Sequence, residues 1–87
     1  MDNKLKMNIH IEFCIKWNYG PEFERVSKVI NKINPHAIIA SNSTYPRSGA
    51  FEVTIDRELV FSKLSSNRFP NYEEIEMWVK LWSSYII

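Results

Sequence analysis

Two segments of strict alternation constrain the fold of this chain more than any other feature. Residues 7–13 and 51–55 change between apolar and polar at each step, and their main apolar members are Ile9, Ile11, Phe13, Phe51, Val53 and Ile55. A period of two is that of a β-strand with one buried face and one solvated face. The sequence therefore predicts a sheet that is covered on one side only.

The polar members of the two strands are predicted to face water. They are His10 and Glu12 on the first strand, and Glu52 and Thr54 on the other. Glu12 and Glu52 are expected to lie opposite each other on neighbouring strands. A carboxylate pair can serve acid–base catalysis, but on an open sheet face the two groups are expected to be ordinary solvated residues.

A first amphipathic helix is predicted over residues 21–33, with its apolar stripe formed by Phe23, Val26, Ile30 and Ile33. Pro21 suits the first turn, where its missing N–H would have no partner. Pro35 disfavours the α conformation of the residue before it, so the helix is expected to end near Asn34.

A second helix is predicted from residue 71 to the end of the chain, with a stripe formed by Ile75, Trp78, Val79, Trp82, Tyr85 and Ile86. Asn71 and Glu74 have the spacing of a capping box at its start. The aromatic stripe is predicted to be core. Met77 and Leu81 lie off the stripe and are candidates for a small exposed apolar patch.

The remaining segments complete the order strand, helix, strand, strand, strand, helix. Residues 36–40 are a short apolar strand candidate, and residues 42–49 are predicted to be a loop. Asp56 and Arg57 start a tight turn into the strand 59–62, and residues 63–69 are a polar connection. A single α+β domain over residues 1–87 is predicted, with two layers, a mixed four-stranded sheet and both helices on one face.

Composition excludes several classes of function. Eleven basic and ten acidic residues are interspersed along the 87 residues, so the net charge of +1 offers no basic stripe for nucleic acid. No apolar run is long enough to span a membrane, which predicts a soluble protein. His10 and His36 have no ligand spacing with the single cysteine, so no metal site is expected. No bound cofactor is expected either.

That single cysteine, Cys14, is the main candidate for chemistry. It follows the first strand and precedes the turn into the first helix, and one cysteine allows no intramolecular disulfide. The absence of a disulfide framework favours a reducing, cytoplasmic location. The helix N-terminus and Lys16 would favour the thiolate form of Cys14.

Several short motifs around Cys14 resemble one family. The run from Glu12 to Pro21, EFCIKWNYGP, is similar to the E-F-C-x-x-U-x-Y-x-P run of selenoprotein W, in which U is selenocysteine. Residues 48–53, SGAFEV, resemble the T-G-x-F-E-V segment of this Rdx family. Residues 59–63 and the pair Phe69–Pro70 resemble its hairpin exit and its F-P motif. The resemblance extends in order over about residues 9–86.

The resemblance implies a thioredoxin-like fold and a small, usually cytosolic redox protein linked to glutathione or to thiol partners. Cys14 matches the first motif position, Tyr19 and Pro21 match flanking positions, and Ser48 and Gly49 match the T-G segment. Trp17 stands where the family has selenocysteine or a second cysteine. With one sulfur at the motif, the chain cannot complete a dithiol cycle alone.

Two hypotheses follow for function. In the first, Cys14 is a nucleophile that exchanges with glutathione or a partner thiol, and Trp17, Tyr19, Ser48 and Gly49 form the binding surface around it. In the second, the protein is a redox-inactive binding module that uses the open sheet face or the 42–49 loop. A homodimer through the open face or through a Cys14–Cys14 bridge remains a further alternative.

Overall fold

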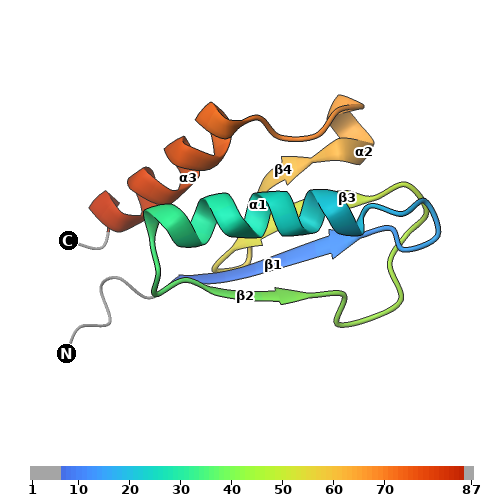
Figure 1. Ribbon diagram of the computed structural model, residues 1–87, viewed down its shortest axis with the longest axis horizontal. Coiled ribbons are helices and arrows are strands. Elements are labelled where there is room, and N and C mark those ends of the chain that lie inside the picture. The colour runs from blue at the N-terminus through green and yellow to red at the C-terminus, as the bar shows by residue number, and fades with distance from the viewer. Residues whose placement is uncertain (1–6, 86–87) are drawn as a thin grey trace.

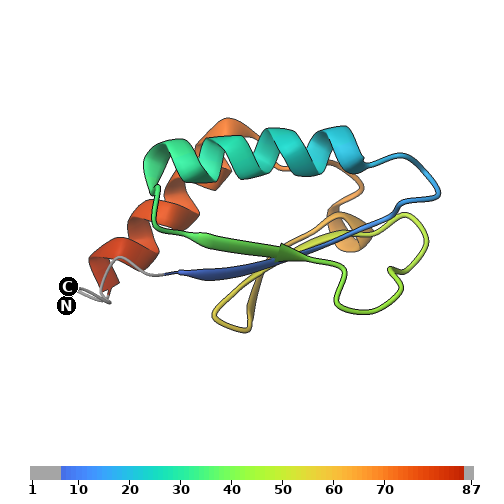
Figure 2. The same ribbon diagram turned by 60° about the horizontal axis from the view of Figure 1, so that its bottom comes forward.

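The computed structural model describes the backbone of residues 7–85 and the side chains up to residue 82. Its elements, in chain order, are β1 (Asn8–Phe13), α1 (Gly20–Ile33), β2 (Ile38–Ser41), β3 (Phe51–Ile55), β4 (Glu58–Ser62), α2 (Lys63–Ser66) and α3 (Tyr72–Tyr85). The strands form one sheet in the order β2-β1-β3-β4, with β1 parallel to β2 and the other pairs antiparallel. Both long helices lie on the same side of this sheet (Figures 1 and 2). The predicted two-layer α+β fold is therefore confirmed.

The core lies between the sheet and the two long helices. It consists of the inward sets of the strands and the inner stripes of α1 and α3, and its buried members are Met7, Ile9, Ile11, Val26, Ile30, Phe51, Val53, Ile55, Phe61, Ile75, Trp78 and Val79. The predicted inward residues of β1 and β3 and the central stripe of α3 are confirmed by this burial. Ile86 and the side chain of Tyr85, which were predicted to extend the stripe, lie outside the described residues.

The β3–β4 connection is a two-residue hairpin turn at Asp56 and Arg57, as predicted. Both residues have positive φ angles, 48° and 76°, which are those of a turn that matches the twist of the strands it joins. The Asp56 carboxylate accepts hydrogen bonds from the backbone N–H of Asn8 at 3.2 Å and from the Trp82 indole N–H at 2.9 Å. The turn is thereby connected both to β1 and to α3.

The helix boundaries follow their predicted signals. Pro21 occupies the first turn of α1, and Asn34 is its C-cap. At the start of α3 the Asn71 side chain accepts from the Glu74 backbone N–H at 2.8 Å, and the Glu74 carboxylate accepts from the Asn71 backbone N–H at 2.9 Å. These two reciprocal bonds are those of a capping box.

The polar connection after β4 contains an element that the sequence did not predict. Residues Lys63–Ser66 form the short helix α2. Its N-cap is Ser62, whose side chain accepts from the Ser65 N–H, and its C-cap is Asn67 in the left-handed conformation. Glu52 was predicted to be solvated on the open face, and this was wrong: it is only 6% exposed. Its carboxylate accepts from the backbone N–H of Leu64, so α2 covers the side chain that the strand pattern assigned to water.

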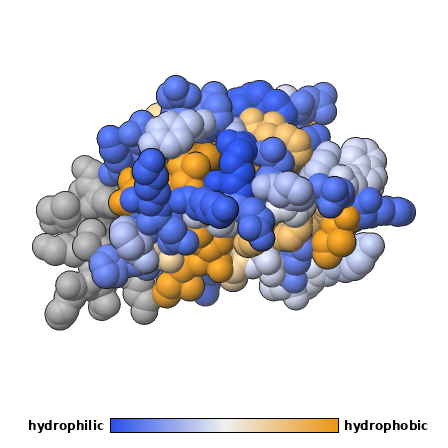
Figure 3. All heavy atoms as spheres, viewed as in Figure 1, coloured by the Kyte–Doolittle hydropathy of each residue, from blue (hydrophilic) through white to orange (hydrophobic). Residues whose placement is uncertain are grey.

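Hydrophobic residues form separate patches on the helix side of the molecule, interrupted by hydrophilic ones (Figure 3). Met77 and Leu81 are exposed, as predicted from their position off the α3 stripe. Among the described residues, no helix has the length and apolar character needed to cross a membrane.

Candidate functional site

Cys14 lies directly after β1, at the end of the molecule where the β1–α1 turn and the 42–50 segment meet (Figures 1 and 2). Its backbone N–H donates to the Ala50 carbonyl at 2.9 Å, and its own carbonyl accepts from the Tyr19 N–H at 3.1 Å. The backbone of Cys14 is thus fixed on both sides by hydrogen bonds. The residue is 2% exposed, so the thiol is covered rather than presented to solvent.

A small cavity of about 70 Å³ adjoins Cys14. One wall is formed by the next two residues of the β1–α1 turn, and the other by the 42–50 segment; the lining residues other than Cys14 are Ile15, Lys16, Tyr45, Pro46 and Ser48. This volume holds only a few water molecules. It is far smaller than a peptide disulfide, so a reaction of Cys14 with such a substrate requires the walls to separate.

Trp17 lies on the surface of the turn, 57% exposed, at the position of the missing second redox residue. A Cβ atom placed on Gly49 would lie 3.2 Å from the Trp17 ring, so the indole packs directly against this glycine. Gly49 has a φ of +75°, in the region that favours glycine. Trp17 also meets the Tyr19 ring edge-on, with centroids 6.2 Å apart.

Tyr19 is part of an aromatic cluster that extends from the turn to the segment before α3. Its ring meets Phe69 edge-on at a centroid distance of 4.8 Å, and Phe69 in turn meets the buried Phe51 at 5.4 Å. The Lys63 ammonium lies 5.3 Å from the ring centroids of both Tyr19 and Phe69. These contacts connect the turn beside Cys14 to the core and to α2.

Glu12 and Arg47 form an ion pair beside the cavity. The Glu12 carboxylate accepts from Arg47 at its backbone N–H (2.7 Å), its Nε (3.1 Å) and its Nη2 (2.8 Å). The side-chain hydrogen bonds from Arg47 lower the pKa of Glu12, partly opposed by desolvation, and the same contact raises the pKa of Arg47. Glu12 does pair with Glu52 across β1 and β3, as predicted, but it is not an ordinary solvated residue.

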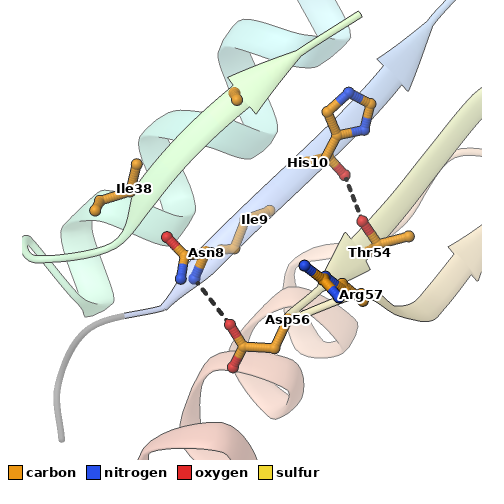
Figure 4. A pocket seen from close by; sticks show the side chains of 8 residues that line it. Asn8, Ile9, His10, Ile38, Thr54, Asp56 and Arg57 are labelled. Atoms are coloured by element: carbon orange, nitrogen blue, oxygen red, sulfur yellow. Dashed lines mark hydrogen bonds between the residues drawn. The ribbon is translucent and has the colours of Figure 1, made fainter. Parts of the chain in front are cut away.

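A hollow on the open sheet face lies away from Cys14. It measures about 470 Å³, and its lining includes side chains from β1, β2, β3 and the hairpin turn (Figure 4). Within it, the Thr54 hydroxyl donates to the His10 carbonyl and the Asp56 carboxylate accepts from the Asn8 N–H. Among residues 7–85 there is no group of three or more His, Cys, Asp or Glu side chains that could hold a metal ion.

The structure divides the predicted site residues into two adjoining groups. Ser48 lines the cavity with Cys14, whereas Trp17, Gly49 and Tyr19 form the packed surface next to it. Sequence reasoning missed the cavity residues Tyr45 and Pro46, although the 42–49 loop was singled out. It also missed the pairing of Glu12 with Arg47, because an ion pair between a strand and a loop has no periodic signal.

The family model named Rdx family matches residues 8–80, which include Cys14, the aromatic cluster and both long helices up to Lys80. This chain belongs to the Rdx family. Its family membership, expected from the motifs around Cys14, is therefore confirmed. A search of curated proteins finds no match.

Solved structures agree with this Rdx assignment at the level of the fold. A selenoprotein W-related protein from Vibrio cholerae superposes with a TM-score of 0.76 at 18% identity, over 90% of this chain and 98% of that one. A protein from Bordetella parapertussis has a TM-score of 0.72 at 13% identity, over 85% of this chain and 94% of that one. The Rdx protein described here therefore has the selenoprotein W-like, thioredoxin-like fold.

Proposed function

We propose that this Rdx protein carries out monothiol exchange, with Cys14 reducing the disulfide between glutathione and a partner protein. The observation that carries the proposal is the position of the chain's only cysteine. It lines a cavity at the β1–α1 turn, next to the segment that resembles the second Rdx motif. We place the activity in the cytoplasm, where glutathione keeps thiols reduced.

The proposed exchange has two steps. The Cys14 thiolate attacks the glutathione sulfur of the mixed disulfide; the bond between Cys14 and glutathione forms, the original S–S bond breaks, and the partner leaves as a thiolate that takes up a proton. A second glutathione thiolate then attacks the glutathione sulfur bound to Cys14 and releases Cys14 with oxidised glutathione. The partner is reduced, one free glutathione thiol is oxidised, and its sulfur joins the glutathione of the original mixed disulfide in oxidised glutathione, so one sulfur in the protein is sufficient.

Trp17 has a definite place in this scheme. A resolving thiol at this position would compete with external glutathione for the mixed disulfide, and the indole cannot do so. Trp17 is exposed and packs against Gly49, which gives a bound peptide an aromatic surface at the edge of the Cys14 cavity. External glutathione therefore replaces the missing second redox residue.

Intact mass spectrometry tests the proposal directly. The purified protein is incubated with oxidised glutathione near neutral pH, with Cys14→Ser as the matched control. We expect a single glutathione adduct on the wild-type chain that dithiothreitol removes, and none on the variant. A wild-type chain that stays unmodified under conditions that modify an unstructured cysteine peptide would overturn the proposal.

A second candidate function is binding without thiol chemistry, and the exposure of apolar side chains at the same end of the molecule favours it. Tyr45 is 83% exposed, and Trp17 and Ile15 are also exposed, while the thiol between them is covered. Exposed aromatic side chains are typical anchors of protein interfaces. In this case the partner would contact the rim of the cavity and Cys14 would only fill the space beneath it.

Affinity purification of tagged variants from the cells that make the protein separates the two candidates. A binding module would retain the same co-purified partner after Cys14→Ser and lose it after Trp17→Ala combined with Tyr45→Ala. A thiol-exchange protein would instead lose, on Cys14→Ser, those partners that are bound through a disulfide and released by reductant.

A further inference from the structure

The 42–50 segment, which forms one wall of the Cys14 cavity, is held against the end of β1 by the Glu12–Arg47 ion pair. We infer that this pair is a latch that sets access to Cys14: while it is closed the thiol is covered, and when it breaks the cavity wall moves away. Arg47 and Glu12 are thus positioning residues, which act through the wall and not on the thiol itself. As regulation of the Cys14 site, the inference rests on the proposed function.

The position of Arg47 within the segment is the first part of the argument. Arg47 stands between Pro46 and Ser48, both of which line the Cys14 cavity. Its backbone N–H and its guanidinium donate to the same Glu12 carboxylate, so main chain and side chain are tied to one point on β1. Loss of that carboxylate therefore frees the Arg47 N–H between two wall residues, while the Arg47 carbonyl still accepts from the Ala50 N–H at 3.1 Å.

The fixed ends of the segment are the second part. Near its start, the Asn42 side chain accepts from the Phe13 N–H at 2.9 Å and donates to the Phe13 carbonyl at 3.1 Å. The Ser43 N–H donates to His10 Nε2 at 3.3 Å. At its end, the Ala50 carbonyl accepts from the Cys14 N–H. With both ends bonded to β1 and to Cys14, an opening at Arg47 displaces the middle of the segment while its ends stay in place.

The exposure of the latch is the third part. The Arg47 side chain is 64% exposed, so water replaces the lost bonds of the guanidinium when the pair breaks, whereas the Glu12 side chain is 20% exposed and only partly solvated. Exposed ion pairs contribute little to global stability. The latch can therefore open at low cost while the core beneath β1 and β3 remains folded, which is the behaviour of a local opening unit.

The test measures the rate at which Cys14 is alkylated in the native protein. Glu12→Gln keeps the size of the side chain but removes its charge. The matched control is Glu74→Gln, because Glu74 also forms a two-bonded pair with an arginine, Arg68, at 2.8 and 2.7 Å, but at the start of α3. Iodoacetamide serves as the small reagent and a pyrene maleimide as the bulky one, both at equal pH, and the unfolding constant of each variant is measured in guanidinium chloride.

We expect Glu12→Gln to accelerate alkylation by roughly five-fold, the factor that corresponds to about 1 kcal/mol in an opening equilibrium. The acceleration should be larger for the bulky reagent, since the wall excludes by size, and Glu74→Gln should leave both rates unchanged. Arg47→Gln should reproduce the effect, and the double variant should add little to either single change.

Equal rates in the wild type and Glu12→Gln would overturn the latch. So would an acceleration that is the same for both reagents and matches the change in the unfolding constant, because that is global unfolding. Neither alkylating reagent involves glutathione, so a working latch with no glutathione adduct would refute the proposed exchange and leave the latch standing. A glutathione adduct on Cys14 together with equal alkylation rates in the wild type and Glu12→Gln would refute the latch and leave the proposed exchange standing.

Discussion

At the scale of single residues, Gly49 combines two constraints that no other residue type meets. Its φ of +75° is strained for a residue with a side chain, and a Cβ would lie 3.2 Å from the Trp17 ring. We expect Gly49→Ala to lower the free energy of unfolding by about 1–3 kcal/mol, through backbone strain and displacement of the indole. Chemical denaturation monitored by tryptophan fluorescence measures this change.

Gly20 provides the matched control. It is the first residue of α1, and a Cβ added there would meet nothing within 4 Å. Gly20→Ala should therefore be neutral or stabilise the protein by up to about 1 kcal/mol. Combining Gly49→Ala with Trp17→Ala should recover the part of the loss that is due to the indole. A Gly49→Ala variant with an unchanged free energy of unfolding would show that the Trp17 contact does not hold the turn.

At the scale of elements, the start of α3 has a pH-dependent stability. The Glu74 carboxylate accepts hydrogen bonds from the Arg68 side chain and from the Asn71 N–H. These bonds, partly opposed by desolvation, lower the pKa of Glu74 from 4.5 to about 2. The contribution of the ionised Glu74 carboxylate to the free energy of unfolding is therefore fully present above about pH 4.5, and it is lost as the pH falls towards 2. Because about half of the Arg68 side chain is exposed to solvent, which screens the pair, we expect the loss to be only about 0.5–1 kcal/mol.

Urea denaturation at about pH 5 and about pH 3 in wild type and Glu74→Gln measures this effect. The variant should be less stable at the higher pH and should approach the wild type at the lower one. The Glu74→Gln variant should still lose some stability in acid, because the pKa of Glu12 is also lowered in the folded protein. An unchanged difference between the two proteins at both pH values would argue against the assigned ionisation of Glu74.

The short helix α2 depends on the buried carboxylate of Glu52. This group is 6% exposed and accepts from the Leu64 N–H at 3.1 Å and the Phe51 N–H at 3.3 Å. Glu52→Ala should cost about 1–3 kcal/mol, since it leaves the Leu64 donor without its partner. Hydrogen exchange of the Leu64 amide should accelerate, whereas the exposed Glu24→Ala should change neither quantity. Protection of that amide in Glu52→Ala would refute the anchoring role.

At the scale of the whole molecule, Asp56 connects the hairpin turn, β1 and α3 through one side chain. Asp56→Ala should destabilise the fold by about 1–3 kcal/mol, because two donors lose their acceptor and a positive φ loses a residue that tolerates it. Trp82→Phe removes only the indole donor and should cost less. Guanidinium denaturation of the two variants gives the comparison, and equal losses would contradict the shared role of Asp56.

Most of the fold could be predicted because its signals are periodic or local. The alternation of β1 and β3, the α3 stripe and the Asn71–Glu74 capping box each required only short-range sequence information. Helix α2 and the burial of Glu52 could not be predicted, because a one-turn helix has no period and its position over β3 is a tertiary contact. The same distinction applies to the candidate site. Cys14 could be found from its local motif, whereas the positions of Pro46 and Arg47 beside the Cys14 cavity depend on the path of the 42–50 loop, which has no periodic signal.

The central claim is that Cys14 performs disulfide exchange with glutathione as the external thiol. Its most direct test is the glutathione-dependent reduction of a glutathionylated peptide, followed by the appearance of oxidised glutathione, with catalytic amounts of wild-type protein or Cys14→Ser. The account predicts turnover above the uncatalysed rate for the wild type and none for the variant. Equal rates for the wild type, the variant and the reaction without protein would contradict it.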